Sequence, residues 1–350
     1  MNILIITQKV DKNDQLLGFF IDWLRLFAEK FEKVTVLCLE KGEFNLPQNV
    51  KVISLGKERG AGKLGQLFNF YFSIFSLRSE YDAVFVHMNP IWVVLGGWAW
   101  RLLNKKVFFW YTSGGVTTKL RLAEKFADVI FTASKESFRL PSKKVIVTGH
   151  GIDTELFKPN PSSFSLRLNL KKDQRFNLKI LSVGRIAPVK NYEILVDAAK
   201  ILKDEGVSFV ITMVGEAPLN RDKYYVLSIK DKIKELGLEN NFNFVGKVNH
   251  KDLSQYYQEN DIFVHLSKTG SLDKTILEAM ACEMNILSSN DSSRSILPKE
   301  LIFNENDPIE LAEKIQLVSQ KPHSQELRNY VVENHNLNKL INKISEIIKS

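Results

Sequence analysis

Short apolar runs alternate with stretches of helical period along the whole chain. Gly18–Phe31 and Leu64–Leu77 show the pattern of amphipathic helices. The apolar runs of the first half, each of which predicts a strand, are Ile3–Thr7, Val34–Leu39, Val50–Leu55, Ala83–His87, Lys106–Tyr111, Val129–Ala133 and Lys144–Thr148. Strands that alternate with helices in this way are typical of parallel α/β folds.

The same alternation restarts after a polar stretch near the middle of the chain. The second set of predicted strands is Lys179–Val183, Ser208–Val214, Phe242–Val245, Asp261–Leu266 and Asn285–Ser288. Helices are predicted around the apolar positions of Ile194–Leu202 and over Arg221–Leu236, Lys251–Gln258, Lys274–Ala281, Pro308–Val318 and Leu337–Ile348. The chain therefore predicts two similar α/β halves.

We expect four parts along the chain. They are an amino-terminal domain over 1–160, a linker over 161–176, a second domain over 177–330 and a terminal segment over 331–350 that packs back on the first domain. Each domain is expected to be Rossmann-like and doubly wound. Such domains bind ligands at the carboxyl ends of their strands, so a ligand cleft is expected between the two halves.

Composition and charge agree with a globular protein. The chain has 350 residues, of which 44% are hydrophobic and 25% charged, which excludes disordered and collagen-like classes. The net charge is +8, and the whole excess lies in residues 1–170, which hold 23 Lys or Arg against 15 Asp or Glu. The basic half carries no nucleic-acid recognition motif, so nucleic acid is not an expected partner.

The sequence favours a cytoplasmic protein. Cys38 and Cys282 lie in apolar runs, which indicates core thiols in a reducing compartment. The amino terminus enters a strand directly, without the pattern of a signal peptide. The apolar stretches Leu64–Leu77 and Ile91–Leu103 are interrupted by polar residues or glycines, and both are shorter than the roughly 20 residues of a membrane span. Peripheral contact with the inner membrane face stays open.

The first candidate for chemistry follows the strand Lys179–Val183. Gly184 allows a tight turn there, and Arg185 and Lys190 flank the start of the next helix. Cations beside the free N–H groups of a helix start form a site for an anion such as phosphate. The alternative is a pair of solvated loop charges.

The second candidate follows the strand Asp261–Leu266. Ser271 is a plausible N-cap, so the amides of Asp273, Lys274 and Thr275 would point toward an anion. Glu278 lies one turn after Lys274, inside an apolar run, and suits an acceptor for two vicinal hydroxyls. An ordinary surface pair between Lys274 and Glu278 is the alternative.

Several blocks together resemble one family. GRIAPVKN, MVGEAP, FVGKV and DIFVHLSKTGSLDKTILEAMACEMNIL occur in the order seen in the carboxy-terminal domain of family-4 retaining glycosyltransferases of the GT-B fold. Gly18 stands where that family has a glycine loop, and GHGIDTELFKP resembles its block before the linker. The resemblance covers nearly the whole chain.

The resemblance implies a role for each matching residue. Arg185 and Lys190 match the cations that hold the donor diphosphate, and Glu278 matches the second glutamate of the E-x7-E motif, which binds ribose. The backbone of Leu272–Thr275 matches the segment around the donor, and the donor-binding blocks also contain Gly184, Gly215 and Gly270. The implied reaction is hexosyl transfer from a nucleotide diphosphate sugar with retention, without a metal or a further cofactor, by front-face attack.

Three positions depart from the family pattern. Gly270 replaces the first glutamate of E-x7-E, Asp273-Lys274 stands where many relatives have a glycine, and Ser113 stands where relatives often carry histidine. These departures keep two alternatives open: a protein that binds nucleotide sugar without turnover, and a GT-B-type nucleotide-sugar epimerase. His87 and His150 are further candidates for the cleft because each ends or follows a predicted strand.

Other motifs carry less weight. GAGKLG at 60–65 matches the dinucleotide fingerprint by its letters, but a lysine-rich lead-in separates it from the preceding strand. The chain contains no D-x-D pair and no Cys/His cluster of the kind that holds a metal.

The acceptor stays unidentified, and an anionic or lipid-linked molecule is one option. The aromatic stretch Leu67–Phe75 follows Lys57, Arg59 and Lys63, which suits an interfacial patch. A buried helix against the sheet is the alternative.

Overall fold

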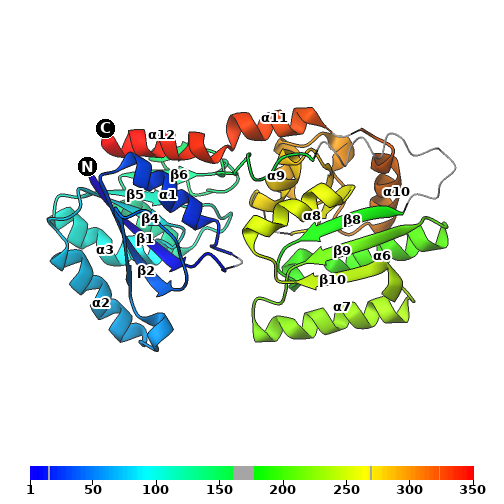
Figure 1. Ribbon diagram of the computed structural model, residues 1–350, viewed down its shortest axis with the longest axis horizontal. Helices are drawn as coiled ribbons and strands as arrows, with labels where there is room; N and C mark the ends of the chain where they lie inside the picture. The colour runs from blue at the N-terminus through cyan, green and yellow to red at the C-terminus, as the bar shows by residue number, and fades with distance from the viewer. Residues whose placement is uncertain (15, 161–176, 269, 323) are drawn as a thin grey trace. The chain divides into compact units, whose positions relative to one another are not determined.

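The chain folds into two compact units. The structure is a computed structural model that describes residues 1–14, 16–160, 177–268, 270–322 and 324–350 (Figure 1). Unit 1 comprises Met1–Gly151 and His335–Ser350, and unit 2 comprises Ile152–Asn334. The linker expected over 161–176 lies outside the described residues. Among the described residues, no helix is both long and apolar enough to cross a membrane.

Unit 1 is built on a parallel sheet. Within the described residues, its seven strands have the order β3-β2-β1-β4-β5-β6-β7. The strands are β1 (Asn2–Val10), β2 (Lys33–Lys41), β3 (Val50–Ser54), β4 (Ala83–His87), β5 (Lys106–Trp110), β6 (Val129–Thr132) and β7 (Val145–Val147). The order reverses between β1 and β4, which is the topological switch of a doubly wound sheet.

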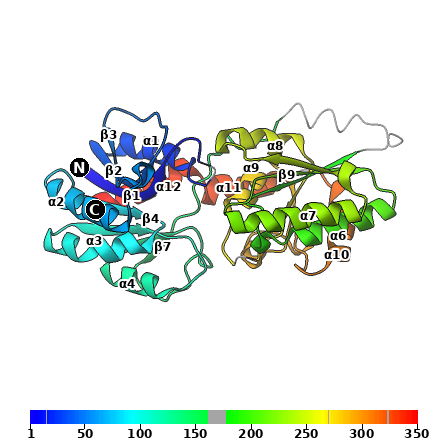
Figure 2. The same cartoon turned by 90° about the horizontal axis from the view of Figure 1, so that it is seen from below.

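Helices cover both faces of this sheet. The helices are α1 (Phe20–Lys30), α2 (Lys63–Ser76), α3 (Pro90–Leu102), α4 (Thr118–Phe126) and α12 (Leu337–Lys349). Alternate residues of each strand point to opposite faces, so Ile3 and Ile5 join the core under α1 and α12, while Leu4 and Ile6 join the core under α2, α3 and α4. Figures 1 and 2 both show α2 and α3 side by side on their face.

The last helix completes unit 1. Leu340, Ile341 and Ile344 on α12 are buried in the same core as Phe20 and Trp23 of α1. Asn336 caps α12 by accepting a hydrogen bond from the backbone N–H of Lys339 at 3.0 Å. Each fully buried aliphatic side chain contributes about 1.5–3 kcal/mol, so this amphipathic face is sufficient to hold the helix.

Unit 2 repeats the doubly wound plan with a smaller sheet. Within the described residues, its five parallel strands have the order β10-β9-β8-β11-β12. The strands are β8 (Leu178–Val183), β9 (Phe209–Val214), β10 (Phe242–Gly246), β11 (Ile262–His265) and β12 (Asn285–Ser288). The helices are α6 (Tyr192–Asp204), α7 (Lys223–Glu235), α8 (Leu253–Glu259), α9 (Lys274–Ala281), α10 (Pro308–Ser319) and α11 (Gln325–Asn334).

The predicted fold class is confirmed, and each predicted strand and helix is found near its expected bounds. Helices α3, α4 and α11 were not predicted. Helix α3 lies in the apolar stretch Ile91–Leu103, which has no polar face and so no amphipathic period. Helices α4 and α11 each bury only two residues, Leu120 and Ala123 in α4 and Leu327 and Val331 in α11, so their periodic signal in the sequence is weak. Both cysteines are free and buried.

Candidate functional site

The loops after β8, β9 and β10 meet at the carboxyl edge of the unit 2 sheet. The N–H of Gly184 donates to the carbonyl of Val214 at 2.9 Å, and the N–H of Gly215 donates to that of Gly246 at 2.8 Å. Gly184 and Gly215 have φ values of 151° and 138°, which favour glycine. A Cβ on Gly215 would lie 1.9 Å from the carbonyl oxygen of Gly184, so only glycine fits there.

Lys190 lies in the loop that joins β8 to α6, and its side chain is buried. Its Nζ lies 2.7 Å from Oδ2 of Asp273, which immediately precedes α9. The backbone N–H of Lys268 donates to the carbonyl of Val189 at 3.0 Å, so the two loops are also joined through their backbones. One of the two predicted cations is therefore already paired with a carboxylate.

His265, at the end of β11, contacts the same carboxylate oxygen. Its Nε2 lies 2.8 Å from Oδ2 of Asp273. Burial and the charge of Lys190 lower the pKa of His265, so the imidazole is neutral at pH 7. Burial works to raise the pKa of Asp273, but Lys190 and His265 outweigh it and hold that pKa well below its usual range. At neutral pH Asp273 is thus an ionised carboxylate between the ammonium group of Lys190 and the neutral imidazole of His265.

Arg185, the second predicted cation, is exposed on the same loop. No salt bridge joins it to another residue within the described parts of the chain. The N–H of Ile186 donates to the carbonyl of Glu216 at 2.9 Å, which holds the backbone beside Arg185 in place. Arg185 is therefore a solvent-facing cation on a fixed loop.

The start of α9 differs from the prediction. Ser271 is not the N-cap: Asp273 occupies that position, with extended backbone angles. Its side chain does not cap the helix, because the carboxylate is directed to Lys190 and His265 instead. The hydroxyl Oγ1 of Thr275, in the first turn, is buried and has no hydrogen-bond partner among the described residues. The hydroxyl of Thr275 and the uncapped N–H groups at the start of α9 can therefore still form hydrogen bonds.

Glu278 is held by two side chains that the sequence pattern did not predict. Its Oε1 lies 3.0 Å from Nε2 of His250, and its Oε2 accepts a hydrogen bond from the hydroxyl of Tyr257 at 2.9 Å. Burial works to raise the pKa of Glu278, but His250 and Lys274 keep that pKa below its usual value. The glutamate is therefore a buried, ionised acceptor, and not one half of a solvated surface pair with Lys274.

The sequence held only weak signals for these partners. His250 stands just after the FVGKV block, and His265 ends a predicted strand, which is a common place for functional side chains. Nothing in the local pattern distinguished Tyr257 from an ordinary aromatic of an amphipathic helix. Leu272 is 2% exposed and belongs to the unit 2 core, and Gly270 lies in the loop before α9.

The remaining predicted residues belong to unit 1. Gly18 precedes α1, and its N–H donates to the carbonyl of Asp14 at 2.9 Å. Ser113 lies in the segment after β5, and its N–H donates to the carbonyl of Ser137 at 2.9 Å. His87 is buried and stacks on Phe20 with ring centroids 4.2 Å apart.

His150 is buried too, and its backbone N–H donates to Nδ1 of His335 at 3.1 Å. Both histidines thus lie within packed surroundings of unit 1.

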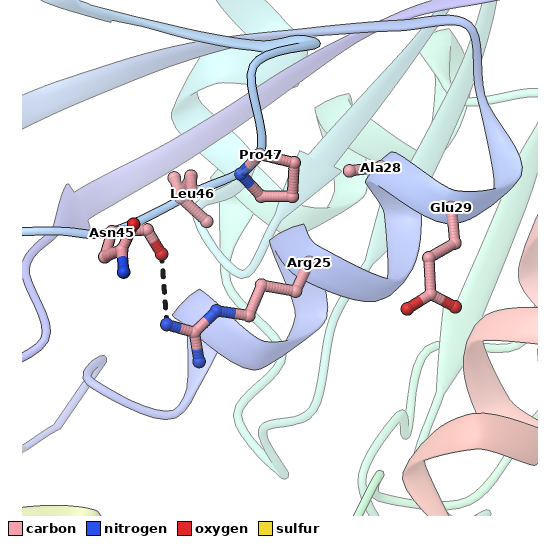
Figure 3. A pocket seen from close by; sticks show the side chains of 6 residues that line it. All are labelled: Arg25, Ala28, Glu29, Asn45, Leu46 and Pro47. Atoms are coloured by element: carbon pink, nitrogen blue, oxygen red, sulfur yellow. Dashed lines mark hydrogen bonds between the residues drawn. The ribbon is translucent and has the colours of Figure 1, made fainter.

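Two pockets lie away from these residues. One of about 410 Å³ lies between α1 and the segment that joins β2 to β3, and Arg25 donates to the carbonyl of Asn45 at 3.0 Å on its wall (Figure 3). The other, of about 680 Å³, is in unit 2 between residues 289–310. Neither pocket is lined by a residue of the predicted site. Among the described residues, no group of three or more His, Cys, Asp or Glu could hold a metal ion.

Comparison with known proteins defines the class. Residues 168–337 match the family model Glycosyl transferases group 1, and this segment carries the whole Lys190, Asp273 and Glu278 cluster. Solved structures of the GT-B fold superimpose on the entire chain, so the fold is GT-B. The predicted GT-B fold is thereby confirmed, and the match over residues 168–337 agrees with the expected resemblance to glycosyltransferases.

Particular relatives are similar to a part of the chain. The chain is 30% identical over 151 residues to mannosylfructose-phosphate synthase of Agrobacterium fabrum, and 30% identical over 158 residues to the amylovoran biosynthesis glycosyltransferase AmsK of Erwinia amylovora. These alignments cover 42% and 43% of this chain. They span only about a third of the relatives, 32% and 35% of their lengths.

Structural similarity extends further. Anabaena Alr3699/HepE, solved in complex with UDP, has a TM-score of 0.79 at 21% identity, with all of both chains covered. Sucrose-phosphate synthase from Thermosynechococcus elongatus has a TM-score of 0.77 at 19% identity, with 99% of this chain and 98% of that chain covered. At these identities the similarity establishes the fold.

Proposed function

We propose that this chain transfers a hexose from a nucleoside diphosphate sugar to an acceptor, with retention and without a metal. The observation that carries the proposal is the placement of Lys190 and Arg185 on one loop at the carboxyl edge of the unit 2 sheet, beside the start of α9. Doubly wound domains bind ligands at this edge, and cations near a helix start favour diphosphate.

The chemistry follows from where charge develops. When the bond between sugar and diphosphate breaks, the leaving oxygens gain negative charge. Cations held in place before the reaction stabilise that transition state more than the ground state. Lys190 is held by Asp273, and Arg185 projects from a fixed loop, so both are prepared for this role.

Asp273 makes the site of this chain distinctive. Its carboxylate shares Lys190 with the incoming diphosphate, and so opposes tight binding of the anion. It also presents an acceptor close to the position of the missing first glutamate, now Gly270. We infer that Asp273 takes over hydrogen bonding to the sugar hydroxyls while His265 orients it.

Glu278 is the proposed ribose acceptor, and His250 and Tyr257 are its positioning residues. Each carboxylate oxygen has two lone pairs, and each accepts one hydrogen bond here. The second lone pair of each oxygen stays available for a vicinal hydroxyl. Burial excludes water from the pair, which strengthens such hydrogen bonds.

Uridine is the first base to test. Neighbouring structures contain UDP, UDP with glucose, and UDP-glucose, although they share only 18–21% identity with this chain. The predicted cytoplasmic location is consistent with a nucleotide sugar as co-substrate. An anionic or lipid-linked acceptor is the proposed acceptor class.

Binding without turnover is the second candidate. Two observations favour it: Gly270 removes a carboxylate, and Asp273 neutralises Lys190. The enzyme and the binder differ in one product, because only a transferase or hydrolase releases nucleoside diphosphate. An epimerase would instead produce an epimerised sugar when it is supplied with the donor and no acceptor.

The test combines titration with product analysis on the full chain. Calorimetry with UDP-glucose, UDP-N-acetylglucosamine and GDP-mannose identifies the donor. Arg185→Ala and Lys190→Met should each weaken its binding at least about tenfold, since hydrogen bonds to charged groups contribute about 1.5–3 kcal/mol. Lys200→Ala, on the exposed face of α6, is the matched control and should bind like the wild type. Equal affinity for all four proteins would refute the site.

Product analysis then separates the remaining possibilities. Release of nucleoside diphosphate supports transfer, and the anomeric configuration of the product by NMR tests retention. Unchanged rates in excess EDTA test the absence of a metal. Binding without release of nucleoside diphosphate would establish the second candidate.

A further inference from the structure

Helix α2 of unit 1 exposes an apolar stripe. Leu64, Phe68 and Phe72 follow one another at four-residue spacing and are 84%, 70% and 65% exposed. The rings of Phe68 and Phe72 stack at 6.3 Å. The opposite face of the same helix buries Phe70 and Ile74 in the core. Core packing therefore explains one face of α2 and leaves the other unexplained.

Helix α3 extends this surface. Trp98 and Leu102, one turn apart, are 44% and 75% exposed. The Nε1 of Trp98 donates to the hydroxyl of Tyr71 at 3.2 Å, and that hydroxyl donates to the carbonyl of Leu95 at 3.0 Å. Trp98 also packs against Phe75. We call Leu64, Phe68, Phe72, Trp98 and Leu102 the apolar face.

The stretches of chain that carry the apolar face contain charges of one sign. No Asp or Glu occurs over residues 59–79 or 83–123, which contain α2, α3 and the first half of α4. The basic residues of these two stretches are Arg59, Lys63, Arg78, Arg101, Lys105, Lys106, Lys119 and Arg121. Acidic residues stand only at the borders, at Glu58, Glu80, Asp82 and Glu124. The basic excess of the first half is thus concentrated in the stretches that carry exposed aromatics.

We propose that the apolar face docks on the surface of an anionic lipid bilayer. Leucine and aromatic side chains would lie at the boundary between headgroups and acyl chains, while the surrounding lysines and arginines contact lipid phosphates. Tryptophan in particular favours this boundary. A protein partner of ordinary composition would meet mixed charges, whereas the stretches that carry this face contain basic and no acidic residues, with Arg59 paired to the bordering Glu58, and this excess matches an anionic membrane.

The proposal does not depend on the transferase reaction. A surface-bound unit 1 would meet acceptors carried by lipids, which connects the proposal to the proposed function without resting on it. Binding can be measured without any donor or acceptor, so failure of either proposal leaves the other testable.

Vesicle co-sedimentation tests the proposal directly. The full chain should sediment with vesicles of phosphatidylcholine and phosphatidylglycerol, far less with phosphatidylcholine alone, and less at high salt because screening weakens the attraction. Phe68→Gln with Phe72→Gln should reduce the partition coefficient at least about tenfold, because removal of these two aromatic side chains from water supplies much of the binding free energy. Tyr224→Gln with Leu227→Gln on α7 removes two exposed apolar side chains of unit 2 and is the matched control.

Tryptophan fluorescence gives a second readout specific to this face. Trp98 is 44% exposed, whereas Trp23, Trp92, Trp100 and Trp110 are at most 6% exposed. Brominated lipids should therefore quench Trp98, and Trp98→Phe should remove the quenchable emission. Thermal unfolding of each variant checks that the fold is intact.

Three results would overturn the proposal. The first is the absence of sedimentation with any vesicle. The second is sedimentation that the Phe68 and Phe72 double variant leaves unchanged. The third is a dimer, seen by light scattering without lipid, that the same double variant dissociates; the apolar face would then be a contact between protein copies.

Discussion

The ammonium nitrogen of Lys190 lies 2.7 Å from a carboxylate oxygen of Asp273, although 83 residues separate the two in the chain. The same oxygen lies 2.8 Å from Nε2 of His265. Asp273 thus connects the loop after β8, the end of β11 and the start of α9. The contact therefore places a carboxylate beside Lys190 at the start of α9 and sets the charge balance of this site.

Replacing Asp273 with asparagine should strengthen anion binding and weaken the fold. Without the carboxylate, Lys190 loses its competing partner, so affinity for nucleoside diphosphate should rise several-fold. The same change leaves a mostly buried ammonium unpaired, which should lower the free energy of unfolding by about 2 kcal/mol. Calorimetry and urea unfolding measure the two effects, with Asp204→Asn, an exposed partner of Lys200, as the control. Weaker diphosphate binding in Asp273→Asn would show that the carboxylate supports the donor instead.

The stabilisation by Asp273 should depend on pH in a defined direction. The folded state depresses the pKa of Asp273, so its contribution is present above the unfolded pKa of about 3.9 and is lost as the pH falls through the folded pKa. The difference in unfolding free energy between wild type and Asp273→Asn should therefore stay constant from pH 7 to about 5. It should shrink only below about pH 4. A difference that already shrinks between pH 7 and 6 would contradict this assignment.

His335 should make unit 1 less stable in acid. Burial and the neighbouring His150 lower the pKa of His335 to about 3. The unfolded chain binds a proton near pH 6.5 and the folded chain does not, so stability falls by about 1.4 kcal/mol per pH unit below that point. His335→Asn can still accept the hydrogen bond from the N–H of His150 and should show a shallower fall between pH 6 and 4. Parallel curves for the two proteins would refute the prediction.

Gly215→Ala should be strongly destabilising, and Gly206→Ala only mildly so. A Cβ on Gly215 would collide with the carbonyl oxygen of Gly184, in addition to the strain of φ 138°, for a cost of about 3 kcal/mol. Gly206 has φ 76° but no heavy atom within 4 Å of its Cβ position, so about 1 kcal/mol is expected there. Denaturant unfolding of the pair, with donor titration of any folded Gly215→Ala, measures both. Similar losses for the two would argue against the close approach.

Tyr257→Phe should separate ribose from phosphate recognition. The change removes the hydrogen bond to Oε2 of Glu278 and leaves a buried carboxylate oxygen without it, at a cost of about 2 kcal/mol of stability. If Glu278 binds ribose, affinity for nucleoside diphosphate should fall several-fold while affinity for inorganic pyrophosphate stays unchanged. Tyr81→Phe, a buried tyrosine of unit 1 that donates to the carbonyl of Ile74, is the control. A parallel loss for both ligands would point to a general distortion of the site.

Much of the fold could be predicted because its signals are local. Buried parallel strands appear as continuous apolar runs, and α6 and α12 show clear helical period, so each of these was located from its own residues. Ser271 was mistaken for the N-cap because a serine is a common cap, and the sequence does not show that Asp273, two residues later, begins the helix. The aromatic stretch in α2 was left between two interpretations; the structure shows that one face of the helix is buried in the core and that Leu64, Phe68 and Phe72 are exposed on another.

By itself, the sequence determined the two α/β halves, their strands and the blocks that carry Lys190, Arg185 and Glu278. The tertiary structure decided which charges meet. Lys190 with Asp273, Glu278 with His250 and Tyr257, and α12 with α1 are all contacts between residues far apart in the chain. Hydrophobic period is set by neighbours three or four residues away, whereas charge pairing is set by distances in space. The chemistry of the site therefore became visible only where three loops meet at one edge of a sheet.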